Sequence, residues 1–449
     1  MTYDQLIYNA LLLTMEPDSQ PRFQGYVAIQ GSKIAAVGQA AGLKNLPTAT
    51  EIWNAGGSLV MPGLVNCHGH AAMTLFRGFA DDLPLDQWLQ QHIFPAEARW
   101  VDLDFVYSGT LLAAAEMIRG GVTTVADAYF WETGARQAFA EAGLRAVVAQ
   151  GVIDFPAPGV PEATDNLRVA QDFIDSGRNS SSDLITSSLF CHSPYTCSAP
   201  TLQGAKAITR VHNLPFFIHL AETRQELEQI RYQTGLSPVA YVDTLGLLDE
   251  NTVAVHAVWL DEADRQILTD KGVRLCHCPE SNLKLASGIS PVVDLLERGL
   301  VVGLGTDGAA SNNNLNLLGE MSLAARLHKA AGLDPTVLPA RQVVEMATLA
   351  GARVLGLEEV TGSLTPGKAA DLIMVELKQP HLTPLYDPYS HLVYAAGAGD
   401  VRQVMVQGRW LMRDRHLLTL DWGVIKERAR QWAQKIQPNP VGSRLPAGD

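Results

Sequence analysis

The sequence predicts an α/β protein: a (β/α)8 TIM barrel with a small discontinuous β-sandwich domain formed by the N- and C-terminal segments. Apolar strand candidates alternate with helical stretches through the middle of the chain, which is typical of a parallel sheet. Eight such units fit a closed barrel better than an open doubly wound sheet, which has about five to seven strands. Short strand patterns without intervening helices lie on both sides of this region.

The terminal segments supply the predicted sandwich. Segments 26–29 and 34–37 are separated by Gln30-Gly31-Ser32-Lys33, a pattern typical of a hairpin turn. Further strand patterns occur at 372–375 and 404–407. We therefore expect the first part of the sandwich at 1–60, a metal-dependent barrel at 61–359, and the second part of the sandwich with a C-terminal helix and tail at 360–449.

The barrel elements follow in order along the chain. Its strands are predicted at 59–66, 123–128, 146–152, 185–191, 215–220, 253–258, 273–276 and 301–304. Helical patterns between them include 103–119, 133–142, 202–211 and 261–270.

Composition excludes several classes of function. The 449 residues include 34 Lys and Arg against 47 Asp and Glu, a net charge of −13, which argues against a nucleic-acid partner. The sequence has no run of 18 uncharged apolar residues and no export signal, so we expect a cytoplasmic protein without a membrane partner. Five scattered cysteines are too few for a disulfide scaffold. Homo-oligomerisation stays open.

Histidines and carboxylates follow the predicted strands, at the end of the barrel where active sites lie. His68 and His70 are two residues apart, so their side chains project to the same face. Alone, either histidine could equally be a turn or packing residue, and so could His219 or Asp307. Together, after strands one, five and eight, these four residues supply three imidazoles and one carboxylate, a set that suits one divalent metal such as Zn²⁺.

A gap in lysine usage favours one metal per chain. The sequence has no lysine between Lys44 and Lys206, so strand four cannot provide a carbamylated lysine to bridge two metals. The H-x-E and P-C-x-x-C signature of zinc cytidine deaminases is absent as well, which excludes that unrelated fold.

Several motifs carry a resemblance to a known family. The segments MPGLVNCHGH, HLAET, HCPESNLKLASG and LGTDGAASNN resemble the amidohydrolase superfamily. More narrowly, they are similar to its branch of aminohydrolases and chlorohydrolases, especially the 5-methylthioadenosine/S-adenosylhomocysteine deaminases. The resemblance spans nearly the whole chain, including GSLTPGKAADLIMV at 362–375, where that superfamily returns to its β-sandwich.

The resemblance implies a role for each matching residue. The implied zinc ligands are His68, His70, His219 and Asp307. Asp307 would also accept a proton from the attacking water, and Glu222 would carry a proton to the substrate ring, for which it needs a raised pKa. His256 would stabilise the attacking hydroxide and the tetrahedral intermediate.

Two further residues are implied in substrate binding, beside Glu222 and Asp307. Glu97 matches a glutamate that holds ribose hydroxyls, and His192 matches a histidine that contacts the substrate. The implied reaction converts 5′-methylthioadenosine, or a similar 5′-substituted adenosine, into the inosine analogue and ammonia.

The chain departs from the family pattern after strand three. Relatives that accept S-adenosylhomocysteine commonly carry an arginine there, whereas this chain has Gln150. A neutral amide cannot pair with a carboxylate as guanidinium does. We therefore expect neutral 5′-substituents to be preferred over S-adenosylhomocysteine, unless Arg136 or Arg145 compensates.

Two other functions remain as alternatives. The same metal chemistry could act on another heteroaromatic ring, as in a guanine deaminase or a triazine amino- or chlorohydrolase. Glu97 weakly favours a nucleoside, because a bare ring has no ribose to hold. A non-catalytic scaffold is disfavoured, since every ligand and both proton-transfer candidates are present.

His277 is equally consistent with facing the substrate and with packing, and Asp127 is expected to be structural.

Overall fold

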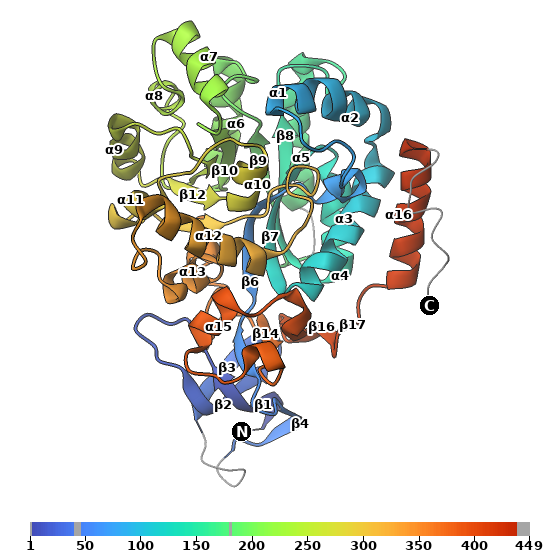
Figure 1. Ribbon diagram of the computed structural model, residues 1–449. Coiled ribbons are helices and arrows are strands. Elements are labelled where there is room, and N and C mark those ends of the chain that lie inside the picture. The colour runs from blue at the N-terminus through green and yellow to red at the C-terminus, as the bar shows by residue number, and fades with distance from the viewer. Residues whose placement is uncertain (1, 40–45, 179–181, 438–449) are drawn as a thin grey trace.

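The computed structural model describes residues 2–39, 46–178 and 182–437; the predicted tail at 438–449 lies outside the described residues. Eight parallel strands in chain order form a barrel, which confirms the predicted fold (Figure 1). They are β6 (Leu64–Gly69), β7 (Val122–Tyr129), β8 (Arg145–Val152), β9 (Ile185–Cys191), β10 (Phe216–Leu220), β11 (Thr252–His256), β12 (Arg274–His277) and β13 (Val302–Leu304).

The chain closes the barrel beyond β13. The backbone N–H of Asp307 donates to the carbonyl oxygen of His68 at 3.0 Å, which ties the last strand to the first. Buried side chains such as Val147, Phe217 and Val255 fill the interior beneath the mouth. The barrel is therefore a packed core that opens only at the carboxyl ends of its strands.

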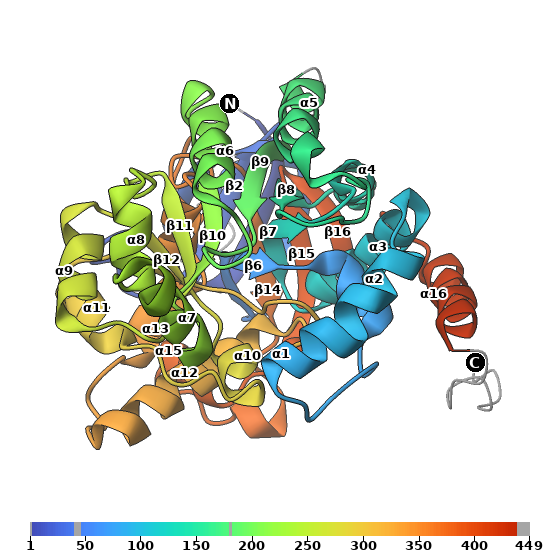
Figure 2. The same cartoon turned by 90° about the horizontal axis from the view of Figure 1, so that it is seen from above.

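Helices surround the barrel on the outside (Figure 2). They are α3 (Leu103–Arg119), α4 (Glu132–Ala142), α5 (Asn166–Arg178), α6 (Ala199–Val211), α7 (Arg224–Thr234), α8 (Pro238–Thr244), α9 (Glu262–Asp270), α11 (Val292–Glu297), α12 (Leu317–Gly332) and α13 (Ala340–Met346). Two short helices lie elsewhere: α10 (Pro279–Lys284) is at the mouth of the barrel, and α14 (Leu349–Val354) contributes Ala352 and Val354 to the core inside it. In the described part of the chain, none of the helices combines the length and apolarity needed to cross a bilayer.

The second sheet joins both ends of the chain. It contains β1 (Tyr3–Leu12), β2 (Arg22–Gln30), β3 (Lys33–Gln39), β4 (Ala49–Asn54), β5 (Leu59–Pro62), β14 (Leu372–Val375), β15 (Val401–Val406), β16 (Arg409–Arg413) and β17 (His416–Leu417). The predicted hairpin is present as β2 and β3, with Gly31 in the left-handed region at φ +59°. β5 pairs with β1 on one side and β14 on the other, so it joins the two halves of the sheet.

The prediction of a single strand at 59–66 is wrong. The chain forms β5 in the terminal sheet and β6 in the barrel, with Gly63 between them. A Cβ atom at Gly63 would lie 2.0 Å from Thr123 Oγ1, so only glycine fits where the chain crosses from one sheet to the other. The domain limits 1–60, 61–359 and 360–449 stay a prediction.

Two helical segments outside the ring complete the molecule. The segment after β6 runs through α1 (Leu85–Gln87), a π-helical turn η3 (Trp88–Ile93) and α2 (Phe94–Trp100), and it lies over the mouth of the barrel (Figure 2). Near the C-terminus, α15 (Pro388–Tyr394) precedes the last strands and α16 (Trp422–Ile436) returns to α3. There the Trp432 ring packs edge-on against Phe105, with centroids 5.2 Å apart.

Candidate active site

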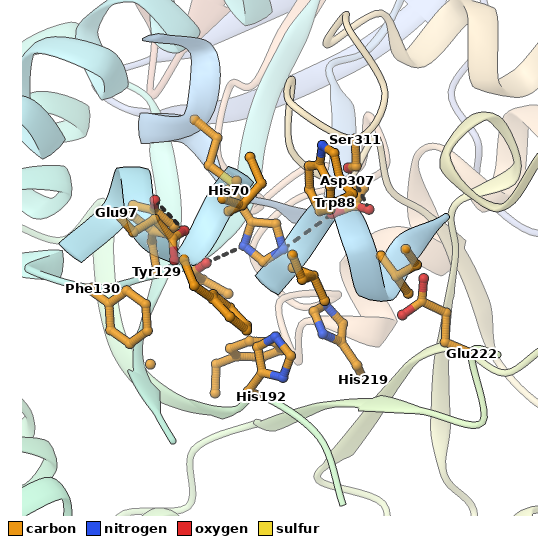
Figure 3. Close-up of a pocket in the computed structure, with 18 of the residues that line it drawn as sticks. His70, Trp88, Glu97, Tyr129, Phe130, His192, His219, Glu222, Asp307 and Ser311 are labelled. Atoms are coloured by element: carbon orange, nitrogen blue, oxygen red, sulfur yellow. Dashed lines mark hydrogen bonds and ion pairs between the residues drawn. The ribbon is translucent and has the colours of Figure 1, made fainter. Parts of the chain in front are cut away.

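A cavity lies at the carboxyl ends of the barrel strands, beneath the α1–η3–α2 segment, and contains about 750 Å³ of empty space when its opening to solvent is included. That segment lines it with Trp88, Ile93, Phe94 and Glu97, which enclose the polar barrel mouth with mainly apolar side chains. Figure 3 shows that Glu97 and Glu222 lie on opposite sides of His70. An enclosed cavity with a few converging polar groups is the usual form of a small-molecule site.

Four of the predicted site residues converge on one point of this cavity. Nitrogen and oxygen atoms of His68, His70, His219 and Asp307 all lie within 4.8 Å of one another. Asp307 Oδ1 is 3.2 Å from His70 Nε2 and 3.5 Å from His68 Nε2. The Nε2 atoms of His68 and His219 are 3.2 Å apart. Strands β6 and β10 and the turn after β13 bring these residues together.

The protonation states of the cluster suit a cation. Burial lowers the pKa of His68 to about 4, and burial together with neighbouring histidines lowers that of His219 well below its usual value. Burial alone would raise the pKa of Asp307, but hydrogen bonds from His68 and His70 hold it well below its usual range. Neutral His68 and His219 and the ionised Asp307 present lone pairs to the shared point, as a divalent metal requires. Burial alone would lower the pKa of His70, but its hydrogen bond to Asp307 raises it, so a metal that binds here displaces a proton from His70 whenever that imidazole is charged.

The backbone next to the cluster is also held in place. His70 Nδ1 hydrogen-bonds the carbonyl oxygen of Ala128, which leaves Nε2 to face Asp307. Asp127 Oδ1 accepts a hydrogen bond from the N–H of Ala71 at 2.6 Å. Asp127 therefore supports the turn that follows His70, in agreement with the structural role expected for it.

Glu222 and His256 form a second polar pair beside the cluster. Glu222 Oε2 lies 3.8 Å from His256 Nε2, and Glu222 Oε1 accepts a hydrogen bond from Ser287 Oγ at 3.4 Å. The Nδ1–H of His256 donates to Asn282 Oδ1 at 2.9 Å. Burial raises the pKa of Glu222, which favours its protonated, proton-donating form.

Glu97 and His192 also line the cavity: Glu97 lies across His70 from Glu222, whereas His192 lies beside His219 (Figure 3). The Tyr129 hydroxyl donates to Glu97 Oε1 at 2.6 Å. Burial raises the pKa of Glu97 to about 7, although the bond from Tyr129 acts in the opposite direction. His192 Nδ1 lies 3.0 Å from Thr196 Oγ1, and its ring centroid is 5.3 Å from that of His219.

The comparisons with known proteins agree with this geometry. The amidohydrolase family matches residues 59–411. The chain belongs to this family.

Relatives with assigned activities match almost the full length of this amidohydrolase. The 5-methylthioadenosine/S-adenosylhomocysteine deaminase of Syntrophobacter fumaroxidans is 50% identical and covers 97% of this chain and 99% of its own. The 5′-deoxyadenosine deaminase of Methanosarcina mazei is 44% identical, and the match covers 96% of this chain and 98% of the relative. The crystal structure of an adenosine deaminase from Xanthomonas campestris with bound zinc superposes with a TM-score of 0.94, at 37% identity and coverages of 97% and 99%.

Two candidates from the sequence lie outside the cavity of the amidohydrolase. Gln150 faces away from it, into a separate hollow lined by Thr133 and Phe173, and its Oε1 accepts the N–H of Glu132 at 3.3 Å. His277 packs against α12, where its Nε2 lies 3.2 Å from His328 Nε2. Gln150 therefore cannot select the substrate by direct contact, and His277 is a packing residue.

The proposed compensating arginines do not line the cavity either. Arg145 Nε donates to Asp371 Oδ2 at 2.9 Å, in a buried ion pair that links β8 to the terminal sheet. Arg136 Nη1 donates to Ser176 Oγ at 3.1 Å. Among the described residues, no lysine or arginine lines the cavity.

One supporting residue escaped the sequence prediction. The Glu226 carboxylate accepts the N–H groups of Ala221 and Glu222, both at 2.8 Å, and thereby fixes the turn that carries Glu222. Thr223, the residue before α7, accepts the N–H of Glu226 at 3.1 Å. The T-x-x-E capping pattern at 223–226 was the signal available in the sequence.

Proposed function

We propose that this amidohydrolase is a zinc-dependent deaminase that converts 5′-methylthioadenosine, or a similar 5′-substituted adenosine, to the inosine analogue and ammonia. The observation that carries the proposal is that one cavity is lined by three of the four candidate metal ligands, by the proton donor Glu222 and by the distant carboxylate Glu97, with the fourth ligand, His68, directly behind the other three. The activities of the relatives support an adenosine-type substrate.

The donor set fits the metal. Three imidazoles and one carboxylate are ligands that zinc accepts, and His68, His70, His219 and Asp307 would hold it. When bound, zinc supplies Lewis-acid chemistry: it lowers the pKa of water from 15.7 to about 7 and makes a hydroxide nucleophile available at neutral pH.

Side chains of the protein then transfer the protons of the reaction. Asp307 accepts the proton that the attacking water loses and later passes it to the exocyclic amino group, which leaves as ammonia when the C6–N bond breaks, while the C6 hydroxyl proton returns to Glu222. Glu222 donates a proton to the ring nitrogen N1 as the nucleophile attacks C6, because the ring loses aromaticity at that moment. His256 directs Nε2 toward the reacting centre, since its Nδ1–H is engaged by Asn282, and hydrogen-bonds the nucleophile.

Substrate selection follows from the rest of the cavity. Glu97, oriented by Tyr129, accepts hydrogen bonds from the ribose hydroxyls, and His192 contacts the nucleoside. Without a cation in the described lining, the cavity has no partner for the amino-acid carboxylate of S-adenosylhomocysteine. We therefore infer that neutral 5′-substituents are preferred, on the basis of this lining and not of Gln150.

The partner of the protein is this small molecule and not a nucleic acid, because a net charge of −13 opposes phosphate binding. A cytoplasmic location and a homo-oligomeric state stay predictions.

The proposal is tested by a spectrophotometric screen of the zinc-loaded protein. The substrates are 5′-methylthioadenosine, 5′-deoxyadenosine, S-adenosylhomocysteine, guanine and a chlorotriazine. We expect kcat/KM to be highest for the neutral 5′-substituted adenosines and at least tenfold lower for S-adenosylhomocysteine, equivalent to about 1.4 kcal/mol. Reaction of a bare ring alone would contradict the nucleoside assignment, and equal values for the two thioethers would contradict the selectivity.

A further inference from the structure

The Asp307 carboxylate divides its hydrogen bonds between its two oxygens. Oδ1 faces the metal cluster and accepts the N–H of Gly308 at 2.7 Å. Oδ2 accepts the hydroxyl of Ser281 at 2.6 Å and that of Ser311 at 2.9 Å. Ser281 is fully buried and does not line the cavity, so its hydroxyl is out of reach of a substrate.

Ser281 belongs to helix α10, and the next residue of α10 contacts a different candidate catalytic group. Asn282, only 1% exposed, accepts the Nδ1–H of His256 through Oδ1 at 2.9 Å. Consecutive residues of α10 thus hold two groups that come from different parts of the barrel, the end of β11 and the turn after β13. A shift of α10 would move both contacts together.

Helix α10 is itself fixed at both ends. At its start, the N–H of Glu280 donates to the buried carboxylate of Glu320 at 3.1 Å, and Asn314 Nδ2 donates to Glu280 Oε2 at 2.7 Å. At its end, Lys284 Nζ donates to Asp81 Oδ1 at 2.7 Å. A helix of six residues has little stability of its own, so these contacts define its position.

We infer that α10 is a positioning element in which Ser281 orients the Asp307 carboxylate toward the metal cluster and Asn282 orients His256 toward the nucleophile. Neither residue touches the substrate, and each acts through its partner. Outer hydrogen-bond partners of this kind typically change metal affinity or activity by about 10- to 100-fold when they are removed. The inference rests on the proposed function, because it assigns His256 and Asp307 the roles given above.

The first experiment measures zinc affinity of the metal-free protein by competition with a chromophoric chelator, independently of turnover. We expect Ser281→Ala to weaken zinc binding by about tenfold. Ser188→Ala is the matched control, because this buried hydroxyl donates to the Pro215 carbonyl instead, and it should bind zinc as the wild type does. Equal affinities in Ser281→Ala and the wild type, or equal losses in both variants, would overturn the inference for Ser281.

The second experiment separates His256 from the metal. We expect Asn282→Ala to lower kcat by about tenfold or more with KM and zinc affinity within twofold of the wild type. Asn282→Asp keeps an acceptor for Nδ1–H and should recover most of the loss. An unchanged kcat in Asn282→Ala, or no recovery in Asn282→Asp with its thermal stability retained, would overturn the role of Asn282. Absence of zinc binding or deamination in the wild type would instead contradict the proposed function.

Discussion

The Tyr129 hydroxyl donates to Glu97 Oε1 at 2.6 Å, and this bond joins a barrel strand to the helix that covers the cavity. It holds the Glu97 carboxylate inside the cavity and partly offsets the effect of burial on its pKa. The orientation of Glu97, the residue proposed to bind the ribose, is therefore set by a barrel strand although Glu97 itself belongs to the covering segment.

Removing this bond should weaken nucleoside binding. We expect Tyr129→Phe to raise KM for 5′-methylthioadenosine by about tenfold, the equivalent of about 1.4 kcal/mol, with kcat changed less than threefold. Tyr107→Phe is the control, since its hydroxyl bonds Glu141 at 2.6 Å outside the cavity. Steady-state kinetics at pH 8 measure both effects. A KM that stays at the wild-type value would show that Tyr129 does not orient Glu97.

Nucleoside affinity should depend on the protonation of Glu97. Burial raises its pKa to about 7, so the carboxylate is mostly protonated at pH 6 and mostly ionised at pH 8. In the proposed binding mode the ionised carboxylate is the stronger acceptor for the ribose hydroxyls. We expect the Kd of the inosine product, measured by calorimetry, to fall as pH rises through about 7. Glu97→Gln should remove this pH dependence, and its persistence would assign the titration to another group.

Two neighbouring histidines of the cavity should behave differently. His219 belongs to the metal cluster, whereas His192 lies beside it with ring centroids 5.3 Å apart. We expect His219→Ala to lose at least 90% of the bound zinc, and with it turnover. His192→Ala should keep about one zinc per chain and raise KM. Metal analysis together with kinetics distinguishes them, and equal zinc content in the two variants would contradict the ligand assignment.

Gln150 should not control the choice of substrate. Its side chain lies behind β8, so Gln150→Ala is expected to leave the ratio of kcat/KM for 5′-methylthioadenosine and S-adenosylhomocysteine within twofold of the wild type. Losing its hydrogen bond to the Glu132 N–H should cost about 1 kcal/mol of the free energy of unfolding. A large change in the ratio would show that Gln150 reaches the substrate in the bound state.

The buried pair of His277 and His328 should make stability pH-dependent. Burial lowers the pKa of His328 to about 4 and that of His277 well below its usual value, so the unfolded chain binds protons that the folded chain does not. This contribution to stability is complete above pH 6.5 and is lost as pH falls toward about 4. For His328 alone it amounts to about 3 kcal/mol.

Urea unfolding of the zinc-free protein at pH 7.5 and 4.5 tests this pair. In the double variant His277→Leu, His328→Leu the free energy of unfolding should fall by at least about 2–3 kcal/mol less than in the wild type, because His328 alone accounts for that amount and His277 adds to it. His416→Leu, which replaces an exposed histidine, should follow the wild type. If the free energy of unfolding falls equally between pH 7.5 and 4.5 in the wild type and the double variant, the pair does not titrate on unfolding.

The sequence by itself determined the barrel and the order of the polar groups around its mouth. Parallel barrel strands all end at one face, so His68, His219 and Asp307 are brought to that face once each is assigned to the end of a strand. The alternation of apolar strands and helices supplies that assignment without any knowledge of distances. The composition, by contrast, only excluded classes of partner.

Tertiary structure decided which strand residues face the cavity and what holds them there. Successive side chains of a strand point to opposite sides, so Gln150 and His277 lie behind the barrel although their neighbours line it or its core. Ser281 and Asn282 belong to a short helix whose position depends on distant contacts such as Glu320. No periodicity in the sequence encodes such contacts, because they join segments that only the completed barrel brings together.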